Sequence, residues 1–359
     1  MDKMTHVKFN MDNFALSLGS SLDNEVGKNR SNTKFSSQRA SFVALKIGEF
    51  NEFSKATLSD MMIYLTFMNH FTNEELIEIL PFQDSTIFGD QNVVDIIRLV
   101  EVVEEYIQLD GLFTLNRDEI IRVVEELHIN EIIKENFFYL ADMESFWCDL
   151  SSPRLPFLIL DMLEDNTIEI SYDHLLSIVE LVSKIIYRYT HREFNKKIID
   201  RIKVMSAFYA FDSKDTYRLM MCGYLYNIGA LKIPQIIFQK ESTLDEVESQ
   251  IVKAIPYYTK EIISMVYGFD DIAKLASTYQ ESLNGSGYPF CLEGNELALK
   301  DRVLAVVILD QVLSEERTYR KDFDLDERIE ILHNQVENGR LDESVVKDFI
   351  GNFYKHHSK

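Results

Sequence analysis

The sequence is poor in cysteine, glycine and proline. Its 359 residues include only three cysteines, Cys148, Cys222 and Cys291, which stand far apart and show no metal-ligand spacing. This pattern argues against a disulfide scaffold or a zinc finger, and favours cysteines that act as small buried hydrophobic side chains. Thirteen glycines and six prolines leave long stretches without a residue that breaks a helix.

Basic residues are scarce relative to acidic ones. The chain has 37 lysines and arginines against 59 acidic residues, which gives a formal net charge of -22. This excess of carboxylates argues against a protein that binds nucleic acid or an anionic membrane through its overall field. No run approaches the roughly 18 consecutive apolar residues of a spanning helix, and the first ten residues lack the apolar core of a secretory signal. We therefore expect a cytoplasmic protein without membrane insertion.

Apolar residues with a helical spacing are abundant. They recur every three or four positions in residues 93–107, 175–186 and 345–353. In the first of these segments Arg98 and Glu101 occupy the opposite face. This period predicts amphipathic helices, and the simplest interpretation of each stripe is a face that packs against a core. The sequence therefore predicts an all-α protein.

The weakest helical pattern lies between Cys148 and Tyr172. Pro153 and Pro156 interrupt the period there, and residues 164–167 resemble a turn. A break of this kind is typical of a domain boundary. We therefore predict two domains, over residues 1–170 and 171–359.

An internal comparison indicates that the two halves are related. Residues 39–69 align without gaps with residues 197–227. Such a repeat predicts two structural units with a common plan. The alignment pairs Phe50 with Phe208, Phe53 with Phe211, Met62 with Met220 and Asn69 with Asn227.

The most distinctive segment is the string Asn284-Gly285-Ser286-Gly287-Tyr288-Pro289. Asn-Gly is a strong turn former because both residues tolerate positive φ, and the second glycine and the proline favour a compact loop. A tight connection between two helices explains these residues. Their surroundings make the string more specific than a turn.

From Leu219 onward the chain resembles the HD-GYP family of helical, metal-dependent cyclic-dinucleotide phosphodiesterases. The matching segments follow the family's order and span roughly residues 175 to 355. They are Gly223 to Gly229, Ile233-Pro234, Pro256 to Tyr258, Glu281, Asn284 to Pro289, Arg302 to Lys321, and Arg340 to Asp342. The resemblance implies a second domain that is an HD-GYP-type helical bundle.

The family's reaction uses two or three metal ions, held by His, Asp and Glu, that activate water for attack on a phosphodiester. This chain carries other residues at the matching positions. They are Phe194 for an early histidine, Tyr226 and Asn227 for the His-Asp pair, Ala230 for a lysine, Ile255 for a histidine, Tyr279 and Gln280 for two histidines, and Ile308 for an aspartate. Phenol, amide and apolar groups are weak donors or none for divalent ions. Only Glu281 remains, so we expect no catalytic residues, no metal and no other cofactor.

The first half resembles the shortened HD-like repeat that precedes the catalytic domain in tandem members of this group. Its own His-Asp position falls on Met68 and Asn69, and its early histidine on Ser36. We therefore expect a degenerate HD-like bundle here as well.

In the second half, His191 lies near one ligand position and is interpreted as a helix-end or surface histidine.

A basic cluster offers a different way to hold a phosphate. Arg317, Arg320 and Lys321 match the place where the family binds its dinucleotide through basic residues. Arginine can grip a phosphate without a metal ion. The alternative, which we favour, is a solvated cluster that pairs with acidic neighbours such as Glu315.

These features leave three functions. We favour a catalytically inactive regulatory or scaffold protein that acts through protein contacts, in cyclic di-GMP signalling. The second is a metal-free sensor of cyclic di-GMP or a related nucleotide. The third, an active phosphodiesterase, ranks last because unrelated residues would have to rebuild the metal site.

The resemblance implies that the loop contacts partners such as diguanylate cyclase domains, through Gly285, Gly287, Tyr288 and Pro289. The alternative is that these residues only shape the loop that connects two helices.

Overall fold

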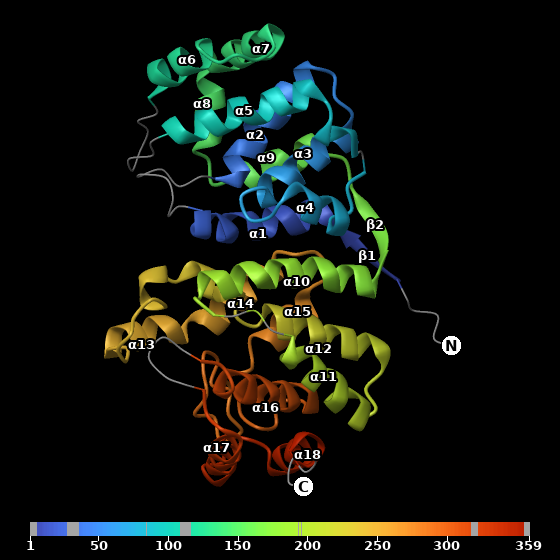
Figure 1. The fold of residues 1–359 in the computed structure, drawn as a ribbon, viewed down its shortest axis with the longest axis vertical. Helices are drawn as coiled ribbons and strands as arrows, with labels where there is room; N and C mark the ends of the chain where they lie inside the picture. The colour runs from blue at the N-terminus through green and yellow to red at the C-terminus, as the bar shows by residue number, and fades with distance from the viewer. Residues whose placement is uncertain are drawn as a thin grey trace. The chain divides into compact units, whose positions relative to one another are not determined.

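The computed structural model describes residues 6–26, 36–83, 85–107, 116–192, 194, 196–316 and 322–354. As the sequence predicts, these residues form an all-α fold, with two short strands (Figure 1). They divide into two compact units, which we call the leading unit (residues 8–169) and the second unit (residues 6–7 and 170–354). Within the described ranges, none of the helices has the length and apolar character that a membrane span requires.

The leading unit is organised around helix α2, which contacts α1, α3, α5, α7 and α9. The apolar side of α2, which includes Phe42, Val43 and Leu45, is fully buried. Burial of such a face is the main source of helix stability in proteins. The elements are α1 (Met11–Val26), α2 (Ser37–Phe50), α3 (Lys55–Phe67), α4 (Asn73–Ile79), η1 (Ser85–Phe88), α5 (Gln91–Tyr106), α6 (Arg117–Glu125), α7 (Glu131–Ala141), α8 (Glu144–Leu150) and α9 (Leu155–Met162).

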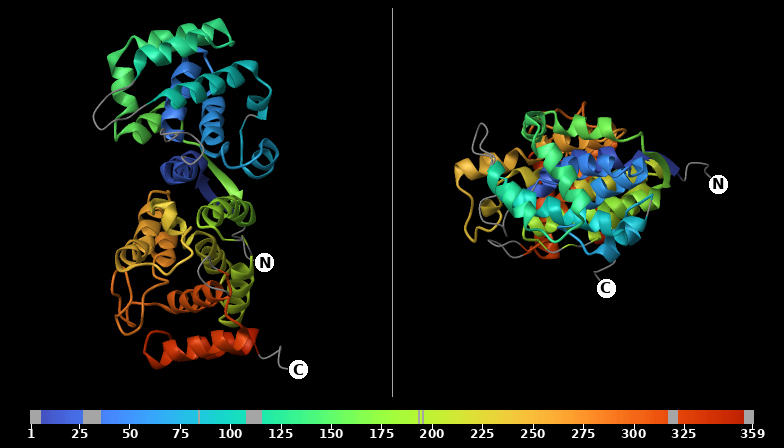
Figure 2. Two further views of the ribbon diagram at one scale, coloured as in Figure 1. Left: turned by 60° about the vertical axis from the view of Figure 1, so that its left-hand side comes forward. Right: turned by 90° about the horizontal axis from the view of Figure 1, so that it is seen from above.

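The second unit packs α12 against α10, α11 and α15, and packs α16 against α11, α17 and α18. Figure 2 shows α17 and α18, in red, beside α16. The elements are α10 (Tyr172–Tyr189), α11 (Lys197–Phe208), α12 (Ser213–Leu225), η2 (Ile228–Lys232), η3 (Gln235–Ile237), α13 (Glu246–Lys253), α14 (Ile255–Ser264), α15 (Asp270–Ala276), α16 (Leu299–Leu313), α17 (Leu325–Glu337) and α18 (Glu343–Phe353).

The segment with the weakest helical pattern contains more regular structure than the sequence suggests. Pro156 does not break a helix: it lies in the first turn of α9, where no backbone N–H is needed and proline is tolerated. Strand β2 (Thr167–Ser171) follows and pairs with β1 (His6–Asn10) in a two-stranded sheet. The division between the two units falls within both strands.

The predicted sequence repeat is also a repeat of helices. Helices α2 and α11 end at Phe50 and Phe208, and helices α3 and α12 begin at Lys55 and Ser213, so equivalent ends lie the same distance apart along the chain. The side chains of Ser54 and Asp212 cap α3 and α12 at matching positions. The turn before each cap contains one residue at positive φ, Glu52 or Ala210. A strand and a helix precede each pair.

The prediction that all three cysteines are buried is wrong for two of them. Cys222 on α12 is buried, whereas Cys148 and Cys291 are exposed free thiols. On α8 the buried face is formed by Phe146, Trp147 and Leu150, which places Cys148 on the outer side of the helix. Burial raises the pKa of the Cys222 thiol, so this thiol stays protonated.

A buried carboxyl group in the leading unit gives a prediction for stability against pH. Asp23 accepts hydrogen bonds from the backbone N–H and the hydroxyl of Ser37, at 2.9 and 3.2 Å, and burial raises its pKa to about 8. Because the folded state holds this proton more tightly than the unfolded state, Asp23 contributes most stability below its unfolded pKa. That contribution falls by about 1.4 kcal/mol per pH unit as the pH rises toward 8.

We therefore predict that Asp23→Asn, which keeps an acceptor but carries no proton to lose, gains stability over the parent protein as the pH rises from 5 to 8. Urea unfolding at several pH values measures the difference between the two proteins, which removes the effect of every other carboxylate. A difference that stays constant with pH would contradict the assignment.

Candidate functional site

A cleft in the second unit brings together most of the residues at the predicted ligand positions. Its volume is about 280 Å³, and Tyr226, Asn227, Ile255, Tyr279 and Gln280 line it. These side chains come from the end of α12, the start of η2, the first residue of α14, and the loop after α15. Residues far apart in the sequence thus share one wall, as the predicted site requires.

Three predicted positions lie outside this cleft. The ring of Phe194 packs edge-on against the ring of Tyr187, with centroids 5.5 Å apart. Ala230 is buried in an apolar cluster with Ile233 and Ile237. Ile308 on α16 lines a neighbouring cavity of about 190 Å³. That cavity shares Tyr279, Gln280 and Val312 with the cleft.

The backbone at Tyr226 and Asn227, the predicted place of the family's His-Asp pair, is fixed by a close approach of η2 to α14. The Thr259 hydroxyl donates to the carbonyl of Tyr226 at 3.0 Å and accepts the N–H of Gly229 at 3.1 Å. A Cβ atom at Gly229 would lie 2.1 Å from the carbonyl oxygen of Ile255, so only glycine fits there. This contact holds Tyr226 and Asn227 at the cleft wall.

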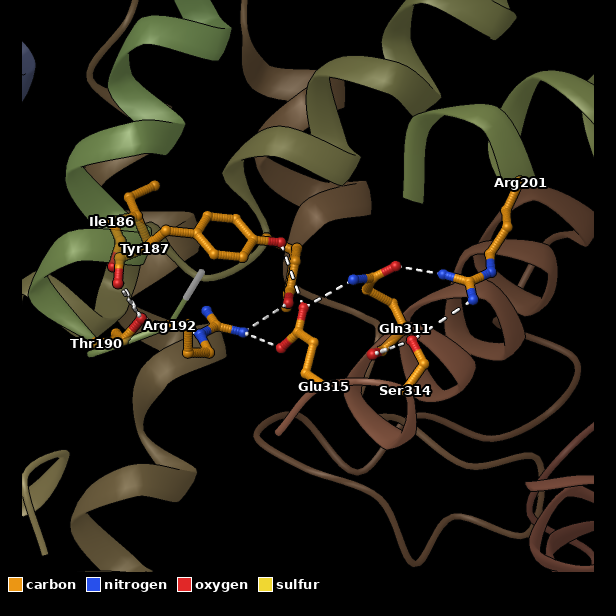
Figure 3. A network of polar contacts seen from close by, with 9 residues as sticks. Ile186, Tyr187, Thr190, Arg192, Arg201, Gln311, Ser314 and Glu315 are labelled. Atoms are coloured by element: carbon orange, nitrogen blue, oxygen red, sulfur yellow. Dashed lines mark hydrogen bonds and ion pairs between the residues drawn. The ribbon is translucent and has the colours of Figure 1, made fainter. Parts of the chain in front are cut away.

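A buried ion pair borders the cleft, because its arginine, Arg192, is one of the lining residues. The guanidinium group of Arg192 donates from Nη1 to the Glu315 carboxylate at 3.0 Å and to the Tyr226 hydroxyl at 3.1 Å, and from Nε to Thr190 at 2.9 Å. It also lies 4.7 Å from the centre of the Tyr187 ring. The two charged side chains are 2% and 5% exposed, and Figure 3 shows them pointing toward each other.

The same network continues onto α16. Gln311 donates to the Glu315 carboxylate at 2.8 Å and accepts from Arg201 of α11 (Figure 3). The network therefore ties the end of α10 to the first half of α11 and to the end of α16. Glu315 itself is buried and paired with Arg192, whereas the predicted basic cluster around residues 317–321 lies outside the described residues.

The charge of Arg192 is permanent. Burial lowers the pKa of this guanidinium, but Tyr226 and Glu315 act in the opposite sense and outweigh burial, so the pKa is raised above its ordinary value. A buried charge of one sign needs a partner of the other, and Glu315 supplies it. The two charges cancel at the base of the cleft.

The side chains of this site do not fit a dinuclear metal centre. Ile255 and Ile308 have no donor atom, and the hydroxyl of Tyr226 is engaged by the arginine. A fixed positive charge at Arg192 would also repel a second cation nearby. Within the described part of the chain, no group of three or more His, Cys, Asp or Glu side chains has a metal-binding arrangement.

The retained Glu281 supports the loop that follows it. Its carboxylate accepts the backbone N–H groups of Phe290 at 2.8 Å and Leu292 at 2.9 Å. Gly285 has φ of 74°, and a Cβ atom at Gly287 would lie 2.4 Å from the backbone of Glu281. Loop architecture therefore explains both glycines.

The remaining residues of the loop lie at the surface and the cleft edge. Tyr288 is half-buried and lines the cleft, and Lys253 lies 5.8 Å from its ring centre. Pro289 and Phe290 are half-buried outside the cleft lining, and Lys260 lies 4.6 Å from the ring centre of Phe290. The loop thus presents aromatic rings next to two lysines.

The basic cluster and His191 are the two predicted features that do not belong to the ligand positions. Arg317, Arg320 and Lys321 lie outside the described residues. His191 follows the end of α10, has φ of 52° and is exposed. Its Nε2 lies 3.2 Å from the amide nitrogen of Gln239. This agrees with a helix-end histidine, although His191 also lines the cleft.

Sequence reasoning missed the pair of Arg192 and Glu315. The available signal was indirect: a lone arginine directly after an amphipathic helix, next to His191. The two partners stand 123 residues apart, so no local pattern links them.

Comparisons with known proteins agree with the geometry of the second unit. Residues 174–345 match a family model described as "HD domain". A 3'3'-cGAMP-specific phosphodiesterase of Vibrio cholerae is 31% identical over 134 residues, 37% of this chain and 31% of the relative. A cyclic di-GMP phosphodiesterase response regulator of Xanthomonas campestris is 30% identical over 132 residues, 36% of this chain and 34% of the relative. The alignments thus span about a third of these relatives.

A solved structure extends the likeness in fold to nearly the whole chain. The crystal structure of a cyclic GMP-AMP-specific phosphodiesterase of Vibrio cholerae has a TM-score of 0.56 and 15% sequence identity. The match covers 96% of this chain and 98% of that one. Residues 174–345 thus match the HD-domain model, and part of the chain is similar in sequence to cyclic-dinucleotide phosphodiesterases.

Proposed function

We propose that this protein is a catalytically inactive member of the HD-GYP group that acts as a regulator in cyclic-dinucleotide signalling. Its homologues are phosphodiesterases for cyclic di-GMP and 3'3'-cGAMP, which supports the signalling context. We infer that the HD domain holds no metal centre and that the leading unit is a second, degenerate HD-like bundle. The helix repeat of α2–α3 and α11–α12 supports the latter.

The observation that carries this proposal is the buried pair of Arg192 and Glu315. A metal centre in an HD domain needs anionic and imidazole donors that converge on an open cation site. Here a guanidinium group is already buried beside Tyr226, and a buried carboxylate neutralises it. Adding divalent ions next to Arg192 would create unbalanced positive charge in a weakly hydrated site. The missing donors and the buried cation therefore support the same conclusion.

A regulator without catalysis acts through contacts, and the loop from Asn284 to Phe290 is our candidate contact surface. Tyr288, Pro289 and Phe290 are half-buried, with Lys253 and Lys260 beside the two rings. Aromatic side chains are enriched at protein interfaces. The resemblance to the HD-GYP family suggests a diguanylate cyclase domain as the partner.

A specific observation favours a second candidate function, a metal-free nucleotide sensor. Tyr226, Ile255 and Tyr279 replace donors in the cleft, yet they do not fill it: about 280 Å³ remains between them. This volume is near the lower end of the range for small-molecule pockets. Sensing and regulation are compatible, since a ligand in the cleft would contact Tyr288 of the same loop.

We predict that the purified protein retains no stoichiometric transition metal after dialysis and does not hydrolyse cyclic di-GMP or 3'3'-cGAMP. The variant Tyr226→His with Asn227→Asp should be equally inactive, because apolar residues at Ile255 and Ile308 still supply no ligand. Elemental analysis and an assay for linear dinucleotide, with manganese or iron added, test both statements. Recovery of about two ions per chain, or turnover by the parent, would refute the proposed inactivity.

We predict that Arg192→Met lowers the free energy of unfolding by about 3–5 kcal/mol, because the buried Glu315 carboxylate loses the positive charge of Arg192. Adding Glu315→Gln should recover most of this loss. The matched control is Lys232→Met, which breaks the more exposed pair with Glu261 and should cost at most about 1 kcal/mol. Urea unfolding measures all four proteins. Equal effects of Arg192→Met and Lys232→Met would show that the buried pair is not a structural element.

We predict that Phe290→Ala weakens binding to a purified diguanylate cyclase domain by about tenfold or more, while circular dichroism stays unchanged. Biolayer interferometry measures the affinity. Tyr267→Ala serves as the control, because Tyr267 is 63% exposed and lies outside the loop. If the parent protein does not bind such a domain, or the two variants bind alike, the loop is not the contact surface for this partner.

A further inference from the structure

Two side-chain amides in the cleft have no hydrogen-bond partner among the residues that the structure describes. Asn227 and Gln280 both line the cleft and are partly exposed in it. Asn227 directly precedes η2 but makes no capping hydrogen bond with its side chain. Within the described ranges neither side-chain amide forms a hydrogen bond with another residue. Each therefore offers one carbonyl acceptor and one NH₂ donor to a molecule in the cleft.

Aromatic and apolar side chains surround these amides. The ring of Tyr279 meets the ring of Tyr226 edge-on, with centroids 5.2 Å apart. Tyr288 and Phe238 add two further rings to the lining. The other wall is aliphatic and consists of Ile237, Leu244, Val252 and Ile255. A mostly apolar cavity with a few polar groups is the usual composition of a small-molecule site.

The charge of the cleft decides which kind of molecule suits it. Arg192 is the one arginine or lysine in the lining of the described cleft, and Glu315 already neutralises it. The whole chain carries a formal charge of -22, which repels anions at longer range. Phosphate binding would need a positive charge that is not compensated. The described cleft therefore favours an uncharged group.

We propose that this cleft binds the nucleobase of a nucleoside, in the place where the ligand positions of the HD-GYP pattern fall. A base is flat, stacks on aromatic rings and presents neighbouring donors and acceptors along its edge. Asn and Gln amides pair with such an edge through two hydrogen bonds. The proposal rests on the metal-free site described above and adds the ligand class: recognition occurs through the base, with Asn227 and Gln280 as the specificity residues.

Isothermal titration calorimetry with guanosine and adenosine, in buffer that contains a chelator, tests the proposal on the full chain. We expect at least one of these nucleosides to bind in the micromolar to millimolar range, and excess inorganic phosphate not to displace it. Asn227→Leu and Gln280→Met should each weaken binding roughly three- to tenfold, since each loses hydrogen bonds to a neutral ligand. Gln250→Met on the exposed side of α13 is the matched control and should bind as the parent does.

Three results would overturn the proposal: no binding of either nucleoside, displacement of the nucleoside by phosphate, or equal affinities of Gln280→Met and Gln250→Met. Thermal unfolding of each variant shows whether a loss of binding reflects a loss of fold. The outcome is separable from that of the proposed function. A protein that contains metal and hydrolyses dinucleotides refutes inactivity, whereas a metal-free, inactive protein that ignores nucleosides refutes only the base site.

Discussion

A charge buried in a protein must be balanced by a charge of the opposite sign, and in the second unit the buried charge that requires this belongs to an arginine. The guanidinium group of Arg192 is shielded from water, so it needs Glu315 at 3.0 Å and the Tyr226 hydroxyl at 3.1 Å. These bonds determine where the end of α10 meets the segment after α16. They also set the orientation of the Tyr226 ring, which forms one wall of the cleft. The packing and the neutral character of the cleft both follow from this pair.

Much of the fold could be predicted from sequence because helices depend on local spacing. The apolar period of residues 93–107 and 175–186 corresponds to α5 and α10. The alignment of residues 39–69 with 197–227 corresponds to two helix pairs with equivalent ends. The prediction was wrong at Pro156, where the same residue type can either end a helix or begin one. Short strands such as β2 depend on pairing with a distant segment, which a local period does not report.

The sequence predicted which residues line the candidate site, but it did not predict which contacts their neighbours make. The family pattern located Tyr226, Asn227, Ile255, Tyr279 and Gln280, and all five line one cleft. It did not indicate the ion pair beside the cleft, because Arg192 and Glu315 stand 123 residues apart in the sequence. Nor did sequence show that Glu281 supports the backbone of Phe290 and Leu292. Such roles depend on three-dimensional contacts between residues that have no fixed spacing.

The contact at Gly229 has a consequence for how quickly and how tightly the cleft can capture a ligand. The missing Cβ lets the backbone of η2 lie directly against α14, and Thr259 bonds both sides of the turn that carries Asn227. The main chain beneath that amide is therefore ordered before any ligand arrives. On the protein side, binding there needs to restrict only side-chain rotamers, so the conformational entropy lost by the protein is small. Without a backbone rearrangement to wait for, we expect association limited by diffusion and orientation, with differences in affinity expressed in the dissociation rate.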